Sequence, residues 1–378
     1  MSEVRVDKIS PRTESYISVD ALSHRNLIIN GDMSIAQRGT SATGLGNGDN
    51  GYHTCDRWRF AESGSPTYEF TQTQSTDVPT GQGFATSLKM DCTTADTSLA
   101  TNDMCRIQQR FEGQNVQYLK YGTSSAQSTT VSFWVKSNKT GNYNVSLVNV
   151  DQSRIIGNIY TINSADTWEK KTITFAGDTV GAFDNDNNNS FQINWGLLGG
   201  TDRIGGDSSS WGANTDNKNV AGQTVNLADS TDNEWLITGV QLEANTVASS
   251  FNFEPHDINL QKCLRYFQKS YIRGEYPGAT TNFGMVSTAR IQNTVSNRPT
   301  NVFFRPILRA TPTMTIYSLV GTSGSVSDVG TSGGTHARDE AVSISGSVSQ
   351  QGLPYLISVS GLTAGDGFCF HYTADAEL

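Results

Sequence analysis

Short apolar segments recur along the whole chain, and turns rich in Gly, Asn, Asp, Ser and Thr separate them. Segments such as Ser132-Phe-Trp-Val-Lys136 and Glu234-Trp-Leu-Ile-Thr-Gly-Val-Gln-Leu-Glu243 have the length and flanking turns of sandwich strands. Apolar residues recur convincingly at helical spacing in one window, residues 256–272. The sequence therefore predicts an all-β protein with a single connecting helix.

Differences in composition divide the chain into four segments. They are an N-terminal extended arm (residues 1–24), a first β domain (25–255), a connector helix (256–275) and a C-terminal β domain (276–378). The arm carries too little apolar surface to fold alone, so we expect it to dock on a partner. Arg25–Ile29 is the expected opening strand of the first domain, and Asp257 is the expected N-cap of the helix.

The charge and the cysteines exclude several classes of protein. The formal net charge is -9 and Lys and Arg form no stripe, which argues against nucleic acid as a partner. No run reaches the ~18 apolar residues of a membrane span, and the first residues lack the apolar core of a signal peptide. Free, mostly buried thiols are expected, with disulfides as the alternative, for Cys55, Cys92, Cys105, Cys263 and Cys369. These properties fit synthesis in a reducing host cytoplasm and release by lysis.

Motifs for catalysis and for metal binding are weak. Gly46-Asn-Gly-Asp-Asn-Gly51 matches a dinucleotide-binding pattern, but no apolar strand precedes it and no helix follows, so a glycine-rich turn is favoured. Asp184, Asp186 and Asn188 have the spacing of calcium-loop oxygens, yet Asn189 replaces the turning glycine; a solvated polar loop is the alternative. No enzyme is expected, although the two carboxylates of a glycosidase meet in space rather than in sequence.

The tryptophans differ in their surroundings. Trp58, Trp134 and Trp235 lie in apolar strands and are expected in the core, and Trp168 is expected to cap it. Trp211 lies among Ser and Gly in the expected loop of residues 199–216, where a sugar platform, a subunit contact and a lid on the core are equal alternatives.

An exposed ring can stack on a pyranose while amides and carboxylates bind its hydroxyl groups. The candidate glycan-binding residues near the first domain's loop are Trp211, Asp202, Arg203, Asp207 and Asn214. A second set flanks an expected Gly/Ser/Thr loop of residues 321–334 and comprises Tyr317, His336, Arg338 and Asp339. The second set is slightly favoured because it lies farther along the chain from the arm; a mere surface connection is the alternative.

Four sequence features occur in a defined order along the chain. They are Val4-Arg-Val-Asp-Lys-Ile-Ser10, Asn26-Leu-Ile-Ile-Asn-Gly-Asp-Met-Ser-Ile-Ala-Gln-Arg-Gly39, Gln241-Leu-Glu243 through Cys263-Leu-Arg-Tyr-Phe267, and Ala374-Asp-Ala-Glu-Leu378. In these features the chain resembles bacteriophage tail-fibre and related virion structural proteins with a carbohydrate-binding-module-like jelly roll. The resemblance implies a jelly-roll β-sandwich for residues 25–255 and a homotrimer attached to the particle by its N-terminus.

Related modules often continue the Asn-Gly-Asp strand into a carboxylate that helps to bind calcium. Here Ser34 follows Met33, and Thr238-Gly-Val240 stands where such modules often carry Asp. Both departures argue against that structural calcium, and no cofactor is expected.

The expected function is that of a trimeric tail fibre that attaches to a glycan of the host surface. A capsid-decorating or head-fibre protein with a purely structural role is the alternative, and a glycan-cleaving tailspike is a third. Expected partners are other copies of the chain, virion proteins bound through the arm, and a host glycan if the protein is an adhesin. The virion-anchoring residues of the arm would be Val4, Val6, Ile9, Tyr16 and Ile17.

Overall fold

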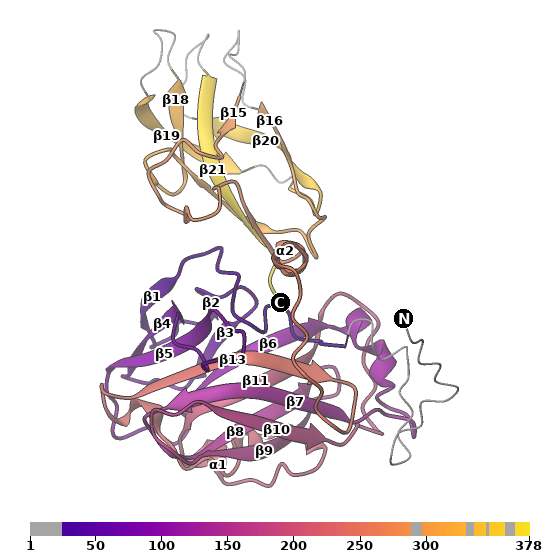
Figure 1. Ribbon diagram of the computed structural model, residues 1–378. Helices are drawn as coiled ribbons and strands as arrows, with labels where there is room; N and C mark the ends of the chain where they lie inside the picture. Colours follow the sequence, from indigo (N-terminus) through magenta and orange to yellow (C-terminus); the bar gives the residue numbers. More distant parts are fainter. Residues whose placement is uncertain (1–24, 289–296, 330–335, 345–347, 360–366) are drawn as a thin grey trace, which may run out of the picture.

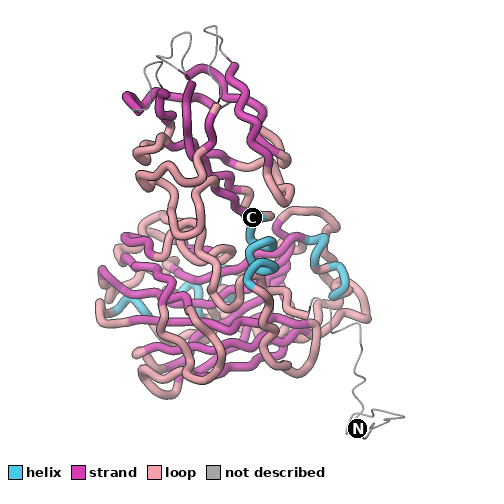
Figure 2. The backbone as a smooth tube through the Cα atoms, turned by 45° about the horizontal axis from the view of Figure 1, so that its top comes forward, coloured by secondary structure: helices cyan, strands magenta, loops and turns pink. Residues whose placement is uncertain are grey.

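A computed structural model describes residues 25–288, 297–329, 336–344, 348–359 and 367–378. The expected anchoring arm, residues 1–24, lies outside the described residues. Strands and loops make up nearly all of the described backbone, and the helices are short (Figure 2). The protein is all-β, as predicted, and consists of a sandwich domain with a smaller C-terminal domain standing on it (Figure 1).

Two antiparallel sheets build the sandwich domain (Figure 1). Sheet A contains, in spatial order, β1 (Ser41–Leu45), β4 (Glu69–Ser75), β5 (Ser87–Thr94), β13 (Glu234–Glu243), β7 (Thr129–Ser137) and β10 (Glu169–Phe175). Sheet B contains β12 (Gly212–Ala213), β9 (Arg154–Ile162), β8 (Gly141–Asn149), β11 (Asn189–Gly199), β6 (Met104–Glu112), β3 (Arg59–Ser63) and β2 (Gly51–Tyr52).

The core lies between the two sheets because alternate residues of each strand point inward. Trp58, Trp195 and Trp235 are fully buried there, and the rings of Trp58 and Trp195 are 5.4 Å apart. Each such side chain stabilises the fold by about 1.5–3 kcal/mol relative to an exposed one. Trp134 is half-buried outside this core, contrary to the prediction, because the adjacent Phe133 and Val135 take the inward positions of β7.

The Asn-Gly-Asp turn is an irregular segment that lies against β13, and the expected strand Arg25–Ile29 does not form. Asn30 adopts a positive φ of 59°, and its side-chain amide donates to the carbonyls of Ile35 and Asp56, both at 2.9 Å. A Cβ atom on Gly31 would lie 2.2 Å from the carbonyl oxygen of Val240. The turn therefore requires Gly at position 31, and the Asn30 side chain holds the loop that follows.

The connector helix is shorter than predicted. Helix α2 spans His256–Leu264, with Pro255 rather than Asp257 at its N-cap. Residues Phe267–Lys269 form β14, which pairs with the last strand of the chain instead of continuing the helix. Pairing with a strand from the far end of the chain overrides the local helical spacing here.

The C-terminal domain is an antiparallel sheet built around β21 (Gly367–Asp375), which pairs with β14, β15, β17 and β18. Its other strands are β15 (Val286–Ser287), β16 (Asn297–Phe303), β17 (Thr313–Tyr317), β18 (Ser325–Val329), β19 (His336–Ile344) and β20 (Gly352–Val359). The expected loop of residues 321–334 contains β18, so that prediction was wrong over Ser325–Val329, where Val326 is fully buried.

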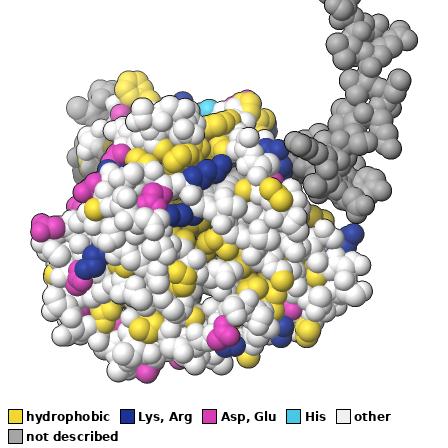
Figure 3. Space-filling model, turned by 60° about the horizontal axis from the view of Figure 1, so that its bottom comes forward, with side chains coloured by type: hydrophobic (Ala, Val, Ile, Leu, Met, Phe, Trp, Pro, Cys, Tyr) yellow, Lys and Arg dark blue, Asp and Glu magenta, His cyan; other side chains and the backbone are white. Residues whose placement is uncertain are grey.

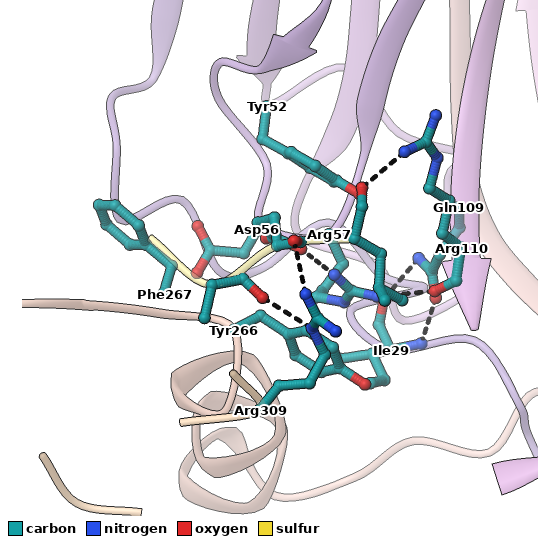
Figure 4. A network of polar contacts seen from close by, with 12 residues as sticks. Ile29, Tyr52, Asp56, Arg57, Gln109, Arg110, Tyr266, Phe267 and Arg309 are labelled. Carbon is teal, nitrogen blue, oxygen red and sulfur yellow. Dashed lines mark hydrogen bonds and ion pairs between the residues drawn. The ribbon is translucent and has the colours of Figure 1, made fainter. Parts of the chain in front are cut away.

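Residues near the end of the chain join the two domains. Arg57 of the sandwich domain forms an ion pair with Glu377, and both side chains are nearly fully buried. Arg38 reaches Asp375 at 2.9 Å, and the Arg57 guanidinium lies 3.4 Å from the centre of the Tyr266 ring. Figure 4 shows Arg57, Arg110, Tyr266 and Arg309 converging at this junction. We call the group Arg38, Arg57, Asp375 and Glu377 the domain clasp.

Candidate functional site

The outward side of sheet B carries an ordered set of polar side chains, which we call the polar face. It comprises Arg59 on β3, Arg106, Gln108 and Arg110 on β6, Gln192 and Asn194 on β11, and Ser146 on β8. Gln108 lies opposite Arg59 on one side and Asn194 on the other, and Asn194 lies opposite Ser146. Directly opposed residues of antiparallel strands share a face, so these side chains project together.

Hydrogen bonds hold the centre of the polar face rigid. The Gln108 amide nitrogen donates to Gln192 Oε1 at 2.8 Å and to Asn194 Oδ1 at 2.6 Å. Its oxygen accepts from Arg110 Nε at 2.8 Å. Gln108, Asn194 and Ser146 are almost completely buried, whereas the arginines are half-buried at the margin. An interlocked row of amides beside partly exposed guanidinium groups is suited to recognising hydroxyl-rich or charged ligands.

Arg59 and Arg106 of the polar face have neutral amide partners, whereas Arg110 also donates to the main-chain oxygen of Leu378. Among the residues that the structure describes, no Asp or Glu side chain forms an ion pair with Arg59, Arg106 or Arg110. Burial, together with the neighbouring positive charges of Arg110, Arg59 and Arg203, lowers the pKa of Arg106 to about 10. Arg106 Nε is buried without a hydrogen-bond partner in the described structure. Unneutralised charges that are partly removed from water are costly to the fold and often mark a binding site.

A long loop, residues 200–223, covers the neighbouring part of sheet B. The Asn144 amide donates to the Ala221 carbonyl at 3.0 Å, and the Gly157 amide donates to the Ser208 carbonyl at 2.7 Å. The loop begins with the short helix α1 (Thr201–Ile204). A depression of about 410 Å³ opens beside it, lined by Gly157, Asn158, Ile159, Gly206, Asp207, Ser208, Ser209, Ala221 and Gly222. We call residues 200–223 the covering loop.

The predicted glycan-binding residues of this loop do not converge on one site. Trp211 is half-buried: its indole nitrogen donates to the Ala176 carbonyl at 2.7 Å, and its ring packs edge-on against Tyr121 at 5.7 Å. This geometry favours the lid on the core among the three alternatives. Arg203 is buried between the Asn102 carbonyl and the Asp216 carboxylate.

The other predicted residues of the loop are dispersed as well. The carboxylate of Asp202 accepts from the Thr101 hydroxyl at 2.6 Å. The Asn214 side-chain oxygen is buried without a hydrogen-bond partner in the described structure. Asp207 is exposed, accepts from the Ser209 amide at 2.9 Å and lines the depression described above. Asp207 is thus the member of the first predicted set that lines this depression.

In the C-terminal domain, the predicted residues take part in the fold. Tyr317 lies on β17 with its ring 6.1 Å from that of Tyr271. The Asp339 carboxylate accepts from the hydroxyls of Ser318 and Ser327 at 2.7 and 3.3 Å. His336 and Arg338 lie on β19, and their side chains fall outside the described part of the structure.

The residues with calcium-loop spacing, Asp184, Asp186 and Asn188, form hydrogen bonds in a local turn. Both carboxylate oxygens of Asp186 accept hydrogen bonds from Asn188, at 2.9 and 2.5 Å, and Asp184 bonds through its backbone to Asp151. The described residues hold no cluster of three or more His, Cys, Asp or Glu side chains that could bind a metal ion. At the Asn-Gly-Asp turn, the Asn259 amide of α2 donates to Asp32 and Ser34, both at 3.2 Å.

A second pocket, of about 400 Å³, lies where α2 and β14 meet the segment after the Asn-Gly-Asp turn. Burial lowers the pKa of Lys269 in this pocket to about 8, and its amine donates to the Glu275 carbonyl at 2.5 Å. Its lining is Ser34, Ile35, Ala36, Gln37, Gln74, His256, Leu260, Leu264, Lys269, Tyr271, Arg273, Gly274 and Tyr276. The Lys269 amine and the Tyr271 hydroxyl are thus both engaged with the chain itself.

One face of the molecule carries few charged side chains. On the face shown in Figure 3, charged side chains are scattered singly or in small groups over a mostly uncharged surface. No helix among the described residues is long and apolar enough to cross a membrane. The polar face was missed at the sequence level because Arg106, Gln108 and Arg110 read only as the polar half of an alternating strand.

Comparison with known proteins gives distant structural likenesses. No protein-family model matches the chain, and no curated protein sequence matches it. The enzymatically active domain of tailspike protein 4 from bacteriophage CBA120 aligns with 54% of this chain at 16% identity and a TM-score of 0.28. The chain spans 21% of that protein.

Carbohydrate-binding modules are also among the neighbours. A family 11 module from Clostridium thermocellum, in complex with a mixed-linked tetrasaccharide, aligns over 56% of this chain and 99% of its own at 10% identity, with a TM-score of 0.27. A family 4 module aligns over 57% and 98% at 14% identity, with a TM-score of 0.26. Scores this low establish neither a shared family nor a shared ligand.

Proposed function

We propose that the protein is a non-enzymatic glycan-binding component of a bacteriophage particle, with the polar face of its sandwich domain as the recognition surface. One observation carries the proposal: amides and half-exposed arginines are interlocked by hydrogen bonds on the outer side of a rigid sheet. A site built on strands is more rigid than one on loops, and its polar groups match the hydroxyl groups of a sugar.

The particle assignment rests on the resemblance of the sequence to phage tail fibres. In this proposal the protein is a homotrimer on the tail surface, attached through residues 1–24 and made in the host cytoplasm. A capsid-decorating protein is the alternative, and it would need no glycan. Deleting residues 2–22 should abolish incorporation into particles while both β domains stay folded, and light scattering of the full chain should give a trimeric mass.

The direct test is binding of the full-length protein to an array of oligosaccharides. A Gln192→Ala variant should weaken binding at least about tenfold, because it removes the side-chain oxygen that accepts from the Gln108 amide and helps to hold the polar face in place. Lys170→Ala, on the exposed surface of sheet A, is the matched control and should bind as well as the unmodified chain. Release of reducing sugar from a bound glycan would contradict the non-enzymatic reading, and binding to no glycan would favour the structural alternative.

A further inference from the structure

Two arginines of the polar face are placed by strand register to act together. Arg59 lies directly opposite Gln108, and Ala61 lies opposite Arg106. Arg59 and Arg106 are therefore diagonal neighbours on the same side of sheet B, about 7–8 Å apart at their Cα atoms. Gln108 is a close neighbour of both arginines on this side of the sheet, and hydrogen bonds to Gln192 and Asn194 fix its side-chain amide. The two arginines therefore lie beside a side chain that is held in one position.

Their hydrogen bonds are few and weak. Arg59 donates to Gln108 Oε1 at 3.5 Å and to Asn50 Oδ1 at 3.3 Å. Arg106 donates to Asn219 Oδ1 at 3.5 Å, and its Nε has no partner in the described structure. All of these acceptors are neutral amide oxygens. By contrast, Arg110 is committed at 2.8 Å to Gln108 and at 2.7 Å to the Leu378 backbone oxygen. Donor capacity is therefore left over on Arg59 and Arg106.

Two more deeply buried arginines are neutralised. Arg57 is paired with Glu377, and Arg203 with Asp216. Arg106 stays protonated near neutral pH because its lowered pKa, about 10, is still well above 7. Two positive charges held half-buried without a counter-charge destabilise the folded chain, and an anion placed between them would relieve that cost. Guanidinium groups bind carboxylate and sulfate oxygens through paired, charge-assisted hydrogen bonds.

We infer that Arg59 and Arg106 bind the anionic group of an acidic glycan, the carboxylate of a uronic acid or a sugar sulfate, while the buried amides of the polar face hold the two arginines in place. This inference rests on the proposed function and adds the class of glycan to it. The overall negative charge, -9, opposes binding to polyanions in general, so recognition of an acidic sugar depends on this local pair.

The test compares three matched sets of oligosaccharides on the full-length protein: uronic-acid, sulfated and neutral. The unmodified chain should bind one acidic set at least about tenfold more tightly than the neutral set, and the preference should fall with added salt. Arg59→Gln and Arg106→Gln should each reduce binding of the acidic set about tenfold and reduce binding of the neutral set less, so that the preference for the acidic set falls. The preferred acidic set distinguishes carboxylate from sulfate.

Controls separate the possible failures. Lys170→Gln, which removes a charge from the exposed surface of sheet A, should leave the preference intact. Arg59→Gln keeps the inference testable if Arg106→Gln fails to fold, since Arg59 makes only long contacts. Binding of neutral glycans alone overturns the acidic class and leaves the proposed function standing. Absence of binding to every set overturns both, and equal binding of a single-stranded oligonucleotide overturns the specificity for sugar.

Discussion

At the scale of single residues, burial separates side chains that look alike in the sequence. Trp211 stands in a polar, glycine-rich loop, yet its ring packs on Tyr121 at the edge of the core. Trp134 stands in an apolar strand, yet it faces outward. An indole's role therefore depends on which side of the sheet or loop meets the core, and local composition does not report that.

Replacing Trp211 should change stability more than binding. Trp211→Ala removes the ring contact with Tyr121 and the hydrogen bond to Ala176, so we expect a loss of about 1–3 kcal/mol in the free energy of unfolding. Trp211→Phe should lose less, because it keeps the ring. Denaturant unfolding measures both variants, and glycan binding measured below the transition should be unchanged. A Trp211 variant that is as stable as the unmodified chain but no longer binds glycan would show that Trp211 is a sugar platform.

The cysteines should be unreactive while the chain is folded. All five are buried and free, and burial raises the thiol pKa of Cys55, Cys105 and Cys263. A raised pKa in the folded state stabilises the protein below the unfolded thiol value of about 8.5, and this stability is lost as the pH rises above it. Thiol labelling should be slow in the native state and should count five thiols in denaturant. Three thiols would reveal a disulfide.

At the scale of elements, the covering loop decides how much of sheet B is open. Its residues Val220 and Gln223 lie against β11 at Gly196, where an added Cβ atom would come within 2.4 Å of Gln223 Oε1 and 2.6 Å of Val220. Gly196 thus allows the loop to approach the sheet closely. Arg106 lies directly opposite Gly196 and donates to Asn219 of the loop, yet it stays partly exposed, as do Arg59 and Arg110.

Gly196→Ala should push the covering loop away from β11. Overpacking of this contact should cost about 1–3 kcal/mol of unfolding free energy. Gly205→Ala is the control: its nearest contact would be at 3.8 Å, so its stability should be close to that of the unmodified chain. Limited proteolysis at residues 200–223 should be faster in Gly196→Ala alone. Equal rates in both variants would show that the loop is not held by this contact.

At the scale of the whole molecule, the domain clasp makes one unit of two β domains. The resemblance to phage proteins includes the terminal Ala374-Asp-Ala-Glu-Leu378, and in the structure this segment supplies the carboxylates that pair with Arg38 and Arg57. A truncation after Tyr271 removes those carboxylates together with β21. We therefore expect the sandwich domain to be destabilised by that truncation.

The Glu377→Gln variant tests the domain clasp by replacing one carboxylate oxygen with an amide nitrogen. It leaves the buried Arg57 without a counter-charge, so we expect a loss of about 3 kcal/mol in unfolding free energy and two separated transitions in calorimetry. Lys139→Gln breaks the pair with Asp229, which is about a third exposed, and should cost less than about 1 kcal/mol. A single transition at an unchanged temperature in Glu377→Gln would contradict the clasp.

Local chemistry in the sequence determined the all-β class, strand β13 to the residue, the burial of Trp58 and Trp235 and the turn at Asn30-Gly31. These features depend on residues that are close in the sequence, through alternation and turn propensity. Much of the candidate glycan site could not be predicted in this way, although Asp207 does border an open depression.

Tertiary structure alone decided the rest. The polar face joins residues of β3, β6, β8 and β11, which only the strand register brings together. The helix expected over residues 256–272 ends at Leu264 because Phe267–Lys269 pairs with β21, more than a hundred residues later. Residues distant in the sequence meet only when the sheets form, since pairing and burial depend on neighbours that the local sequence does not contain.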